Sequence, residues 1–436
     1  MKGLNSLYDY TEKVKNWFME TCHTLKMLVF WLGVGVTTGC IVGITGVAFH
    51  YSIDILSEVR LDHPWIIYFL PFGGAAIVFV YNASKMEHDK GTNAVLLAVR
   101  EDGKLPFRTA PLIFLSTVIT HFLGGSSGRE GAALQIGGSI SAAVGNLFKL
   151  GEKEQKIIVM AGMSACFSAL FGTPVSAAIF SVEVISVGIM HYSAIVPCVT
   201  ASIVAFRIAT ELGVEPTSFK IMFSPDLSAN ILAEVVPFAV LCAFVCRFFC
   251  FTLQKTKKVF KNSIKNKYLR VFTGSVIIII MTLVSGDQTF NGAGGDIIAS
   301  CFAKRAVFYL FVVKLLFTAV TLGCGFKGGE IIPAFFVGAA FGSFASPFFH
   351  IDYSFGAGIG LIALFCGATN CPLSSLLMSI ELFGIKSVPY FAVVCGISYL
   401  VSGDNGLYSE QKIVYSKTRP EYINRTVKNR NKKNVP

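Results

Sequence analysis

The stretch Thr173-Pro-Val-Ser-Ala-Ala-Ile-Phe-Ser-Val-Glu183 returns later in the chain as Cys371-Pro-Leu-Ser-Ser-Leu-Leu-Met-Ser-Ile-Glu381. The proline, two serines and the final glutamate coincide in the two copies. Proline is favoured in the first turn of a helix, where its missing N–H costs nothing. We therefore predict two equivalent apolar helices, each carrying one glutamate, in two related halves of the chain.

A glycine-rich interruption lies upstream of each copy. The first is Gly124-Gly-Ser-Ser-Gly-Arg-Glu-Gly131, and the second is Gly323-Cys-Gly-Phe-Lys-Gly-Gly-Glu330. Apolar helical patterns resume after them, over 132–143 and 332–344. Repeats with glycine-interrupted segments at corresponding positions are typical of secondary transporters, whose binding sites lie between the repeats.

Composition places the chain in a membrane. Of its residues 53% are hydrophobic and 14% charged, whereas soluble domains are about 25% charged. Runs of about 20 apolar residues can cross a bilayer as helices, and we expect such spans within 27–49, 64–82, 231–251, 306–322 and 387–402. We predict an all-α polytopic membrane protein. Its parts would be an N-terminal cytoplasmic segment (1–26), a first repeat (27–213), a linker (214–227), a second repeat (228–416) and a basic cytoplasmic tail (417–436).

The net charge of +11 comes from basic residues between the apolar runs and in the tail. This distribution follows the positive-inside rule, so it predicts that both termini are cytoplasmic and that no nucleic acid is bound. Twelve cysteines without a CxxC pair or histidine-rich spacing predict neither a metal site nor a disulfide framework. We expect no cofactor.

The two interruptions would bring two helix N-termini together, and such ends bind anions. Glu130 lies in the first interruption, and an ionisable residue at membrane depth is a functional hypothesis by default. Its carboxylate could occupy the site of the anion until it is protonated, or it could pair with a nearby arginine. Glu183 and Glu381 could each serve a buried polar network or proton passage.

Three motifs resemble the chloride-channel (CLC) family over nearly the whole chain: Gly128-Arg-Glu-Gly131, Gly328-Gly-Glu-Ile-Ile-Pro333 and Gly406-Leu-Tyr-Ser409. The segments 325–330, 380–384 and 402–411 are similar to its bacterial branch that exchanges fluoride for protons. The resemblance implies two inverted repeats of broken, tilted helices, fluoride export coupled to protons, a homodimer, and a multi-pass location in a bacterial inner (plasma) membrane.

The resemblance also implies residue roles. Glu130 matches the gating and proton-carrying glutamate of the family, and Tyr408 matches the tyrosine at the inner anion position. The implied anion-binding set is Gly91, Thr92, Asn93, Gly128, Arg129, Gly131, Gly329, Glu330, Ile331 and Tyr408. Asn93 would supply an amide donor to a strongly hydrated anion, or it would only complete a turn.

Several residues depart from the family pattern. The inner proton-transfer glutamate falls on Val184, beside Glu183, which leaves Glu183 as the candidate for a proton path. Ile332 and Ala132 stand where threonine is usual, and Thr92 keeps a hydroxyl that leaves chloride open as the substrate.

Three alternative functions remain at this point. Gly125-Ser-Ser-Gly128 also fits an intramembrane serine protease with His191 as partner, but this explains neither repeat nor second interruption, so we expect no enzyme. A chloride/proton antiporter and a passive anion channel would both use the same scaffold.

Overall fold

The computed structural model describes residues 2–87, 89–101 and 104–427. The first half of the chain contains α1 (Lys2–Asp62), η1 (Pro64–Phe69), α2 (Leu70–Ala83), α3 (Thr92–Arg100), α4 (Thr109–Phe122), α5 (Glu130–Leu147), α6 (Glu152–Phe171), α7 (Pro174–Glu183), η2 (Tyr192–Ala194) and α8 (Ile195–Glu211). The second half contains α9 (Ala229–Ser263), α10 (Lys267–Ser285), α11 (Gly295–Ala303), α12 (Tyr309–Cys324), α13 (Ile331–Ala345), η3 (Ser346–Phe349), α14 (Tyr353–Thr369), α15 (Pro372–Phe383) and α16 (Val388–Val401).

The helices have the lengths and composition of a polytopic membrane protein. Six helical segments of the described chain are long and apolar enough to cross a bilayer: Glu12–Asp62, Pro64–Ala83, Tyr192–Glu211, Ala229–Ser263, Lys267–Ser285 and Ile331–Phe349. Other apolar helices, such as α7 and α15, are only 10 and 12 residues long. The predicted spans 27–49, 64–82 and 231–251 fall within these segments, whereas 306–322 and 387–402 coincide with the shorter helices α12 and α16, of 16 and 14 residues.

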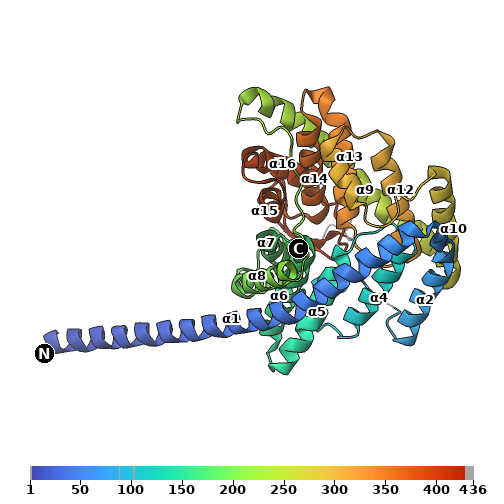
Figure 1. Ribbon diagram of the computed structural model, residues 1–436. Helices are drawn as coiled ribbons and strands as arrows, with labels where there is room; N and C mark the ends of the chain where they lie inside the picture. Colours follow the sequence, from blue (N-terminus) through green and yellow to red (C-terminus); the bar gives the residue numbers. More distant parts are fainter. Residues whose placement is uncertain (1, 88, 102–103, 428–436) are drawn as a thin grey trace.

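Helix α1 is much longer than a bilayer is thick. Its 61 residues would extend about 90 Å at 1.5 Å per residue, and Figure 1 shows its N-terminal part projecting away from the other helices. The helix runs without interruption through the predicted boundary between residues 26 and 27. A hydrophobicity pattern marks where the apolar part begins, but it does not mark a break in backbone geometry.

Close helix packing in both halves depends on glycine. A Cβ atom on Gly137 of α5 would lie 2.1 Å from the carbonyl oxygen of Gly162 in α6. A Cβ atom on Gly338 of α13 would lie 2.5 Å from the carbonyl oxygen of Gly360 in α14. Small residues allow membrane helices to approach at backbone distance. The pairs α5–α6 and α13–α14 thus form equivalent buried cores in the two halves.

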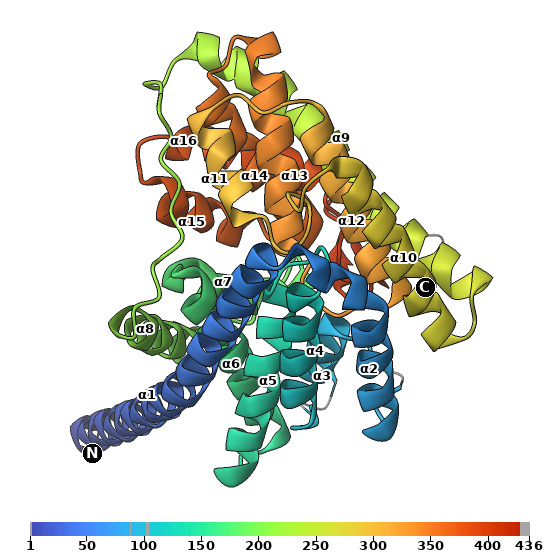
Figure 2. The same ribbon diagram turned by 45° about the vertical axis from the view of Figure 1, so that its right-hand side comes forward.

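The two halves are joined by a reciprocal exchange of hydrogen bonds. Glu183 at the end of α7 accepts the amides of Leu373 and Ser374 at the start of α15, at 3.1 and 2.9 Å. Glu381 of α15 accepts the amides of Val175 and Ser176 at the start of α7, at 2.8 and 2.9 Å. Figure 2 shows α7 and α15 meeting between the first-half and second-half helices.

A small sheet follows the last helix. Strand β2 (Lys412–Tyr415) pairs in parallel with β1 (Ser186–Val187) and antiparallel with β3 (Tyr422–Thr426). The register places Ser186 opposite Lys412. Part of the predicted basic tail is therefore a strand, β3, because its backbone pairs with β2, which in turn pairs with the β1 segment that follows α7. Residues 428–436 of that tail lie outside the described residues.

Candidate anion site

The two glycine-rich interruptions meet in space. Gly128 and Gly329 form an isolated antiparallel bridge, in which the amide of Gly128 donates to the Gly329 carbonyl at 2.8 Å and the reverse bond is 2.6 Å. Helix α5 begins at Glu130 and α13 at Ile331. The bridge therefore fixes two helix N-termini side by side, as the sequence predicts, and their free amides can face one small anion.

A third helix N-terminus joins this pair. Gly91, which has φ of +61°, precedes α3, and the Thr92 hydroxyl at the start of α3 donates to the Gly131 carbonyl at 3.2 Å. The Gln135 side chain donates to the same carbonyl at 2.8 Å. A left-handed φ favours glycine, so Gly91 allows the chain to turn sharply into α3. The starts of α3, α5 and α13 are thus linked around one point.

The Glu130 side chain, in the first turn of α5, is directed toward the place where these helix starts meet. Its side chain is fully buried, and its Oε1 accepts the Arg129 amide at 3.1 Å. Its Oε2 accepts no hydrogen bond from the described residues. A Cβ atom on either Gly128 or Gly329 would lie 2.3 Å from Oε2. The carboxylate therefore lies between the two glycines of the bridge, next to the helix ends that could bind an anion.

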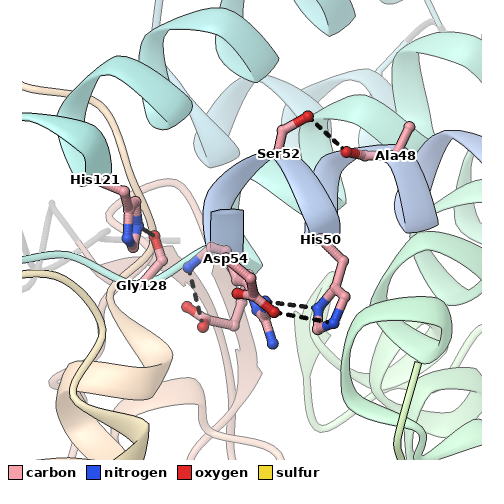
Figure 3. Close-up of polar contacts among 8 residues, drawn as sticks. Ala48, His50, Ser52, Asp54, His121 and Gly128 are labelled. Carbon is pink, nitrogen blue, oxygen red and sulfur yellow. Dashed lines mark hydrogen bonds and ion pairs between the residues drawn. The ribbon is translucent and has the colours of Figure 1, made fainter. Parts of the chain in front are cut away.

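The Arg129 guanidinium does not neutralise Glu130 directly. It donates to His50 Nδ1 at 2.7 Å and to Asp54 at 3.1 Å, and His50 Nε2 lies 3.0 Å from Asp54. Figure 3 shows His50 and Asp54 on α1 facing this interruption, with His121 directed at the Gly128 carbonyl, 3.3 Å away. Arg129, the arginine next to Glu130 in the chain, therefore directs its side chain to His50 and Asp54 and not to the Glu130 carboxylate.

A cavity of about 250 Å³ leads to the site from one side of the molecule. Five basic residues line it together with the acidic residues Glu87, Asp89 and Glu330: Lys90, Lys257, Lys267, Arg270 and Lys327. Lys327 forms an ion pair with Asp89 at 3.0 Å, and Lys267 pairs with Glu87 at 3.2 Å. This excess of positive charge raises the local concentration of anions. The cavity reaches Gly91, Asn93, Gly329, Glu330 and Tyr408.

Asn93 and Tyr408 lie on opposite halves of the chain but line the same cavity. The Asn93 Oδ1 accepts the amide of Glu410 at 2.9 Å. Because the side-chain oxygen is used in this way, the Asn93 NH₂ group is the part that can donate to a ligand. The Asn93 oxygen therefore holds a loop that is 317 residues away in the chain rather than a local turn, and its NH₂ group remains the predicted donor to the anion.

Glu183 lies at the end of α7, against the start of α15, and not at the helix starts that surround Glu130. Its two oxygens accept the α15 amides described above, and its side chain is 7% exposed. The neighbouring Val184, which stands where the family has its proton-transfer glutamate, is fully buried. Both oxygens of the Glu183 carboxyl group are thus occupied by backbone amide donors. This position suits the buried-network alternative, whereas the rest of the predicted set gathers at the helix ends.

Sequence reasoning missed three participants. Gln135 donates to the Gly131 carbonyl, Glu330 is a partly exposed residue of the cavity lining, and Asp89 pairs with Lys327. A polar glutamine inside the apolar pattern 132–143 was an available signal for the first. The Glu330 side chain had the same signal as Glu130, but only its amide was considered. No local signal identified Asp89, because its partner Lys327 is distant in the sequence.

These features define a membrane protein built to handle a small anion between two homologous halves. Residues 72–403 match the family model described as voltage gated chloride channel. The chain therefore belongs to the CLC family of anion transporters and channels, and the recognition from its motifs is confirmed.

Relatives and solved structures agree with this assignment. A chloride/fluoride channel protein from Pseudomonas syringae pv. tomato is 33% identical over 405 residues, which cover 91% of this chain and 90% of that protein. An H(+)/Cl(-) exchange transporter ClcA from Klebsiella pneumoniae is 24% identical over 389 residues, with 80% of each chain covered. The crystal structure of a CLC-type fluoride/proton antiporter has a TM-score of 0.84 at 28% identity, covering 87% of this chain and 97% of that one. A slow cyanobacterial Cl-/H+ antiporter, with a TM-score of 0.76 at 19% identity over 85% and 94% of the chains, shares the fold.

Proposed function

We propose that this protein exports fluoride from the cytoplasm in exchange for protons. The observation that carries the proposal is the Glu130 carboxylate, fully buried between Gly128 and Gly329 at the helix ends where an anion would bind. A carboxylate and an anion cannot both occupy this position, because their charges repel in a medium of low dielectric constant. Protonation removes the charge of Glu130 and frees the helix ends, so one group can link anion movement to proton movement.

The anion would bind to the starts of three helices. Gly91, Thr92 and Asn93 belong to α3, the segment from Gly128 to Gly131 opens α5, and the segment from Gly329 to Ile331 opens α13. Tyr408 would face the anion from the cavity, where it is 3% exposed. In this arrangement the side chains of Arg129 and Glu330 would not bind the anion, and only their backbone amides would contribute.

Fluoride is favoured over chloride by the kind of donors at the site. Fluoride loses more hydration than chloride on binding, so its site needs more hydrogen-bond donors, and the Asn93 amide adds one. The Pseudomonas syringae relative and the fluoride/proton antiporter of known structure support this assignment. A chloride/proton antiporter is the alternative, supported by the Thr92 hydroxyl and by the Klebsiella pneumoniae relative.

The cavity would be the cytoplasmic entrance. Its basic residues Lys257, Lys267 and Arg270 lie around the α9–α10 connection, and positive residues favour the cytoplasmic side. Residues 1–26 and 417–436 would lie on the same side. The parts of the chain from 27–213 and from 228–416 would form the two membrane repeats, with 214–227 as linker, in a bacterial plasma membrane.

A homodimer would place two such pathways side by side. The family resemblance supports this, and so does a matching pair of exposed apolar residues at the junction of α7 and α15. Val175 is 48% exposed and Leu373 is 50% exposed, and they occupy equivalent positions of the two repeats. The proton would reach Glu130 from the cytoplasmic side past Glu183, whose two amide bonds would weaken when it is protonated.

Transport by purified protein in liposomes tests the function. An outward fluoride gradient should drive protons inward against their own gradient, and fluoride flux should exceed chloride flux in the same preparation. A flux that follows only the anion gradient, without proton movement, would establish a passive channel instead. Proton-coupled flux that is faster with chloride than with fluoride would establish the chloride antiporter.

A further inference from the structure

Gln411 lies at the end of the loop that carries Tyr408, and it is a polar residue in the interior of the protein. This glutamine is fully buried. Its side-chain Nε2 donates to the Val184 carbonyl at 2.9 Å and to the Thr369 carbonyl at 2.8 Å, and its Oε1 accepts Asn370 Nδ2 at 2.9 Å. Its backbone amide donates to the Tyr408 carbonyl at 3.1 Å. All its side-chain donors and its acceptor are therefore engaged.

The carbonyls that Gln411 holds come from both halves of the protein. Val184 directly follows α7 of the first half, and Thr369 is the last residue of α14 of the second half. A primary amide offers two donors and one acceptor in one plane, so a single side chain can bind both helix ends. Gln411 thus fixes the Tyr408 loop to the two repeats at once.

The same loop is fixed a second time at the start of the anion site. The Glu410 amide donates to Asn93 Oδ1 at 2.9 Å, and the Glu410 carbonyl accepts Arg100 Nη1 at 2.6 Å. Arg100 is the last residue of α3 and Asn93 belongs to its first turn. A shift of the loop would therefore move Tyr408 and turn the Asn93 side chain together, although these two residues belong to different repeats.

We propose that Gln411 is a positioning residue for anion selectivity, acting through Tyr408 and Asn93. The proposal rests on the proposed function, because it assigns the two donors to fluoride. Binding groups must be held within about 0.5 Å of their productive geometry by the residues behind them. A small anion loses its hydrogen bonds sooner than a large one when its donors move apart. Loosening this loop should therefore penalise fluoride more than chloride.

The test uses the intact protein in liposomes with the substitution Gln411→Met, which preserves side-chain length and removes the hydrogen bonds. We expect fluoride flux to fall about tenfold and chloride flux to change less than twofold. Gln155→Met is the matched control, since Gln155 is also buried, at 8% exposure, and bonds to Asn146 at the α5–α6 connection. This control should keep the wild-type ratio of fluoride to chloride flux.

A double-mutant cycle with Tyr408→Phe distinguishes positioning from general stability. If Gln411 acts partly through Tyr408, Gln411→Met should reduce fluoride flux by clearly less than tenfold in the Tyr408→Phe background, with the remaining loss passing through Asn93. A tenfold loss in both backgrounds, or an equal loss of fluoride and chloride flux, would overturn the proposal. If Gln411→Met does not yield folded protein, Arg100→Met replaces it in the same cycle, because it removes the bond to the Glu410 carbonyl from a partly exposed side chain.

The fluoride and chloride flux of the wild-type protein tests the proposed function independently of Gln411. A wild-type protein that carries chloride and not fluoride would refute fluoride export. The same cycle measured on chloride flux would then decide the role of Gln411, since coupling between the two substitutions would support positioning and independent effects would exclude it.

Discussion

The two glycine-rich interruptions have nearly the same backbone and different side chains. Gly128 and Gly329 pair with each other, and each is followed closely by a helix N-terminus. In the first interruption Glu130 turns its buried carboxylate between these glycines. In the second, Glu330 is partly exposed and lines the cavity. The shared backbone places two helix N-termini together, whereas the difference in side chains is what our proposal of a single gate at Glu130 rests on.

The largest expected effect comes from neutralising the two glutamates separately. Glu130→Gln should abolish proton coupling and leave anion flux that follows only its gradient, because a glutamine cannot exchange a proton. Glu330→Gln should retain coupling, since we assign the gate to Glu130. The measurement is proton movement driven by a fluoride gradient in liposomes. Coupling that survives in Glu130→Gln and disappears in Glu330→Gln would reverse the roles of the two interruptions.

Adding one methyl group to each paired glycine should have the next largest effect. The three atoms nearest to a Cβ atom at Gly128 all belong to the Glu130 carboxyl group, at distances from 2.3 to 2.9 Å. At Gly329 it also meets the backbone nitrogens of Glu130 and Gly131, both at 2.8 Å. We expect Gly128→Ala to fold and to lose coupling by displacing the carboxylate, and Gly329→Ala to be destabilised by about 1–3 kcal/mol as well. Thermal unfolding and proton flux measure the two effects. Equal stability of both variants would contradict this distinction.

The hydrogen bonds that Glu183 and Glu381 accept from the starts of α15 and α7 give a third comparison between the halves. Glu183→Gln and Glu381→Gln should each lower the free energy of unfolding by about 1–3 kcal/mol, because a hydrogen bond to a buried backbone amide is weakened or lost. Glu381 also accepts the Ser176 hydroxyl. Proton coupling should fall only in Glu183→Gln, which would support the proposed path. Equal coupling in both variants would leave Glu183 with a structural role alone.

The smallest expected effect concerns two equivalent positions in the first turns of α5 and α13. Ile332→Thr should change fluoride flux by less than threefold, because Ile332 is 8% exposed and the change removes volume. Ala132→Thr should reduce stability by about 1–3 kcal/mol instead, since Ala132 is fully buried and extra atoms overpack the core. Chemical unfolding and fluoride flux together distinguish these results. A large gain in flux from Ile332→Thr would show that the lack of a hydroxyl at this position of α13 limits transport.

Much of this fold could be predicted because its signals are local. The copies 173–183 and 371–381 carry the repeat, and the apolar runs carry the helices. The continuity of α1 through residue 26 and the β3 strand in the tail could not be predicted. The first depends on the absence of any break in a mixed polar segment, and the second depends on pairing with β2, which in turn pairs with the distant β1.

The sequence by itself determined the membrane class, the two repeats, the family and the residue most suited to be a gate. Glycine, proline and a charge within an apolar chain each have a physical meaning that needs no partner. Only the tertiary structure decided which groups meet. It placed Glu130 between Gly128 and Gly329, assigned Glu183 to the α15 amides, and used Gln411 to connect both halves. Hydrogen bonds between residues distant in the chain depend on the whole fold, so no local pattern can reveal them.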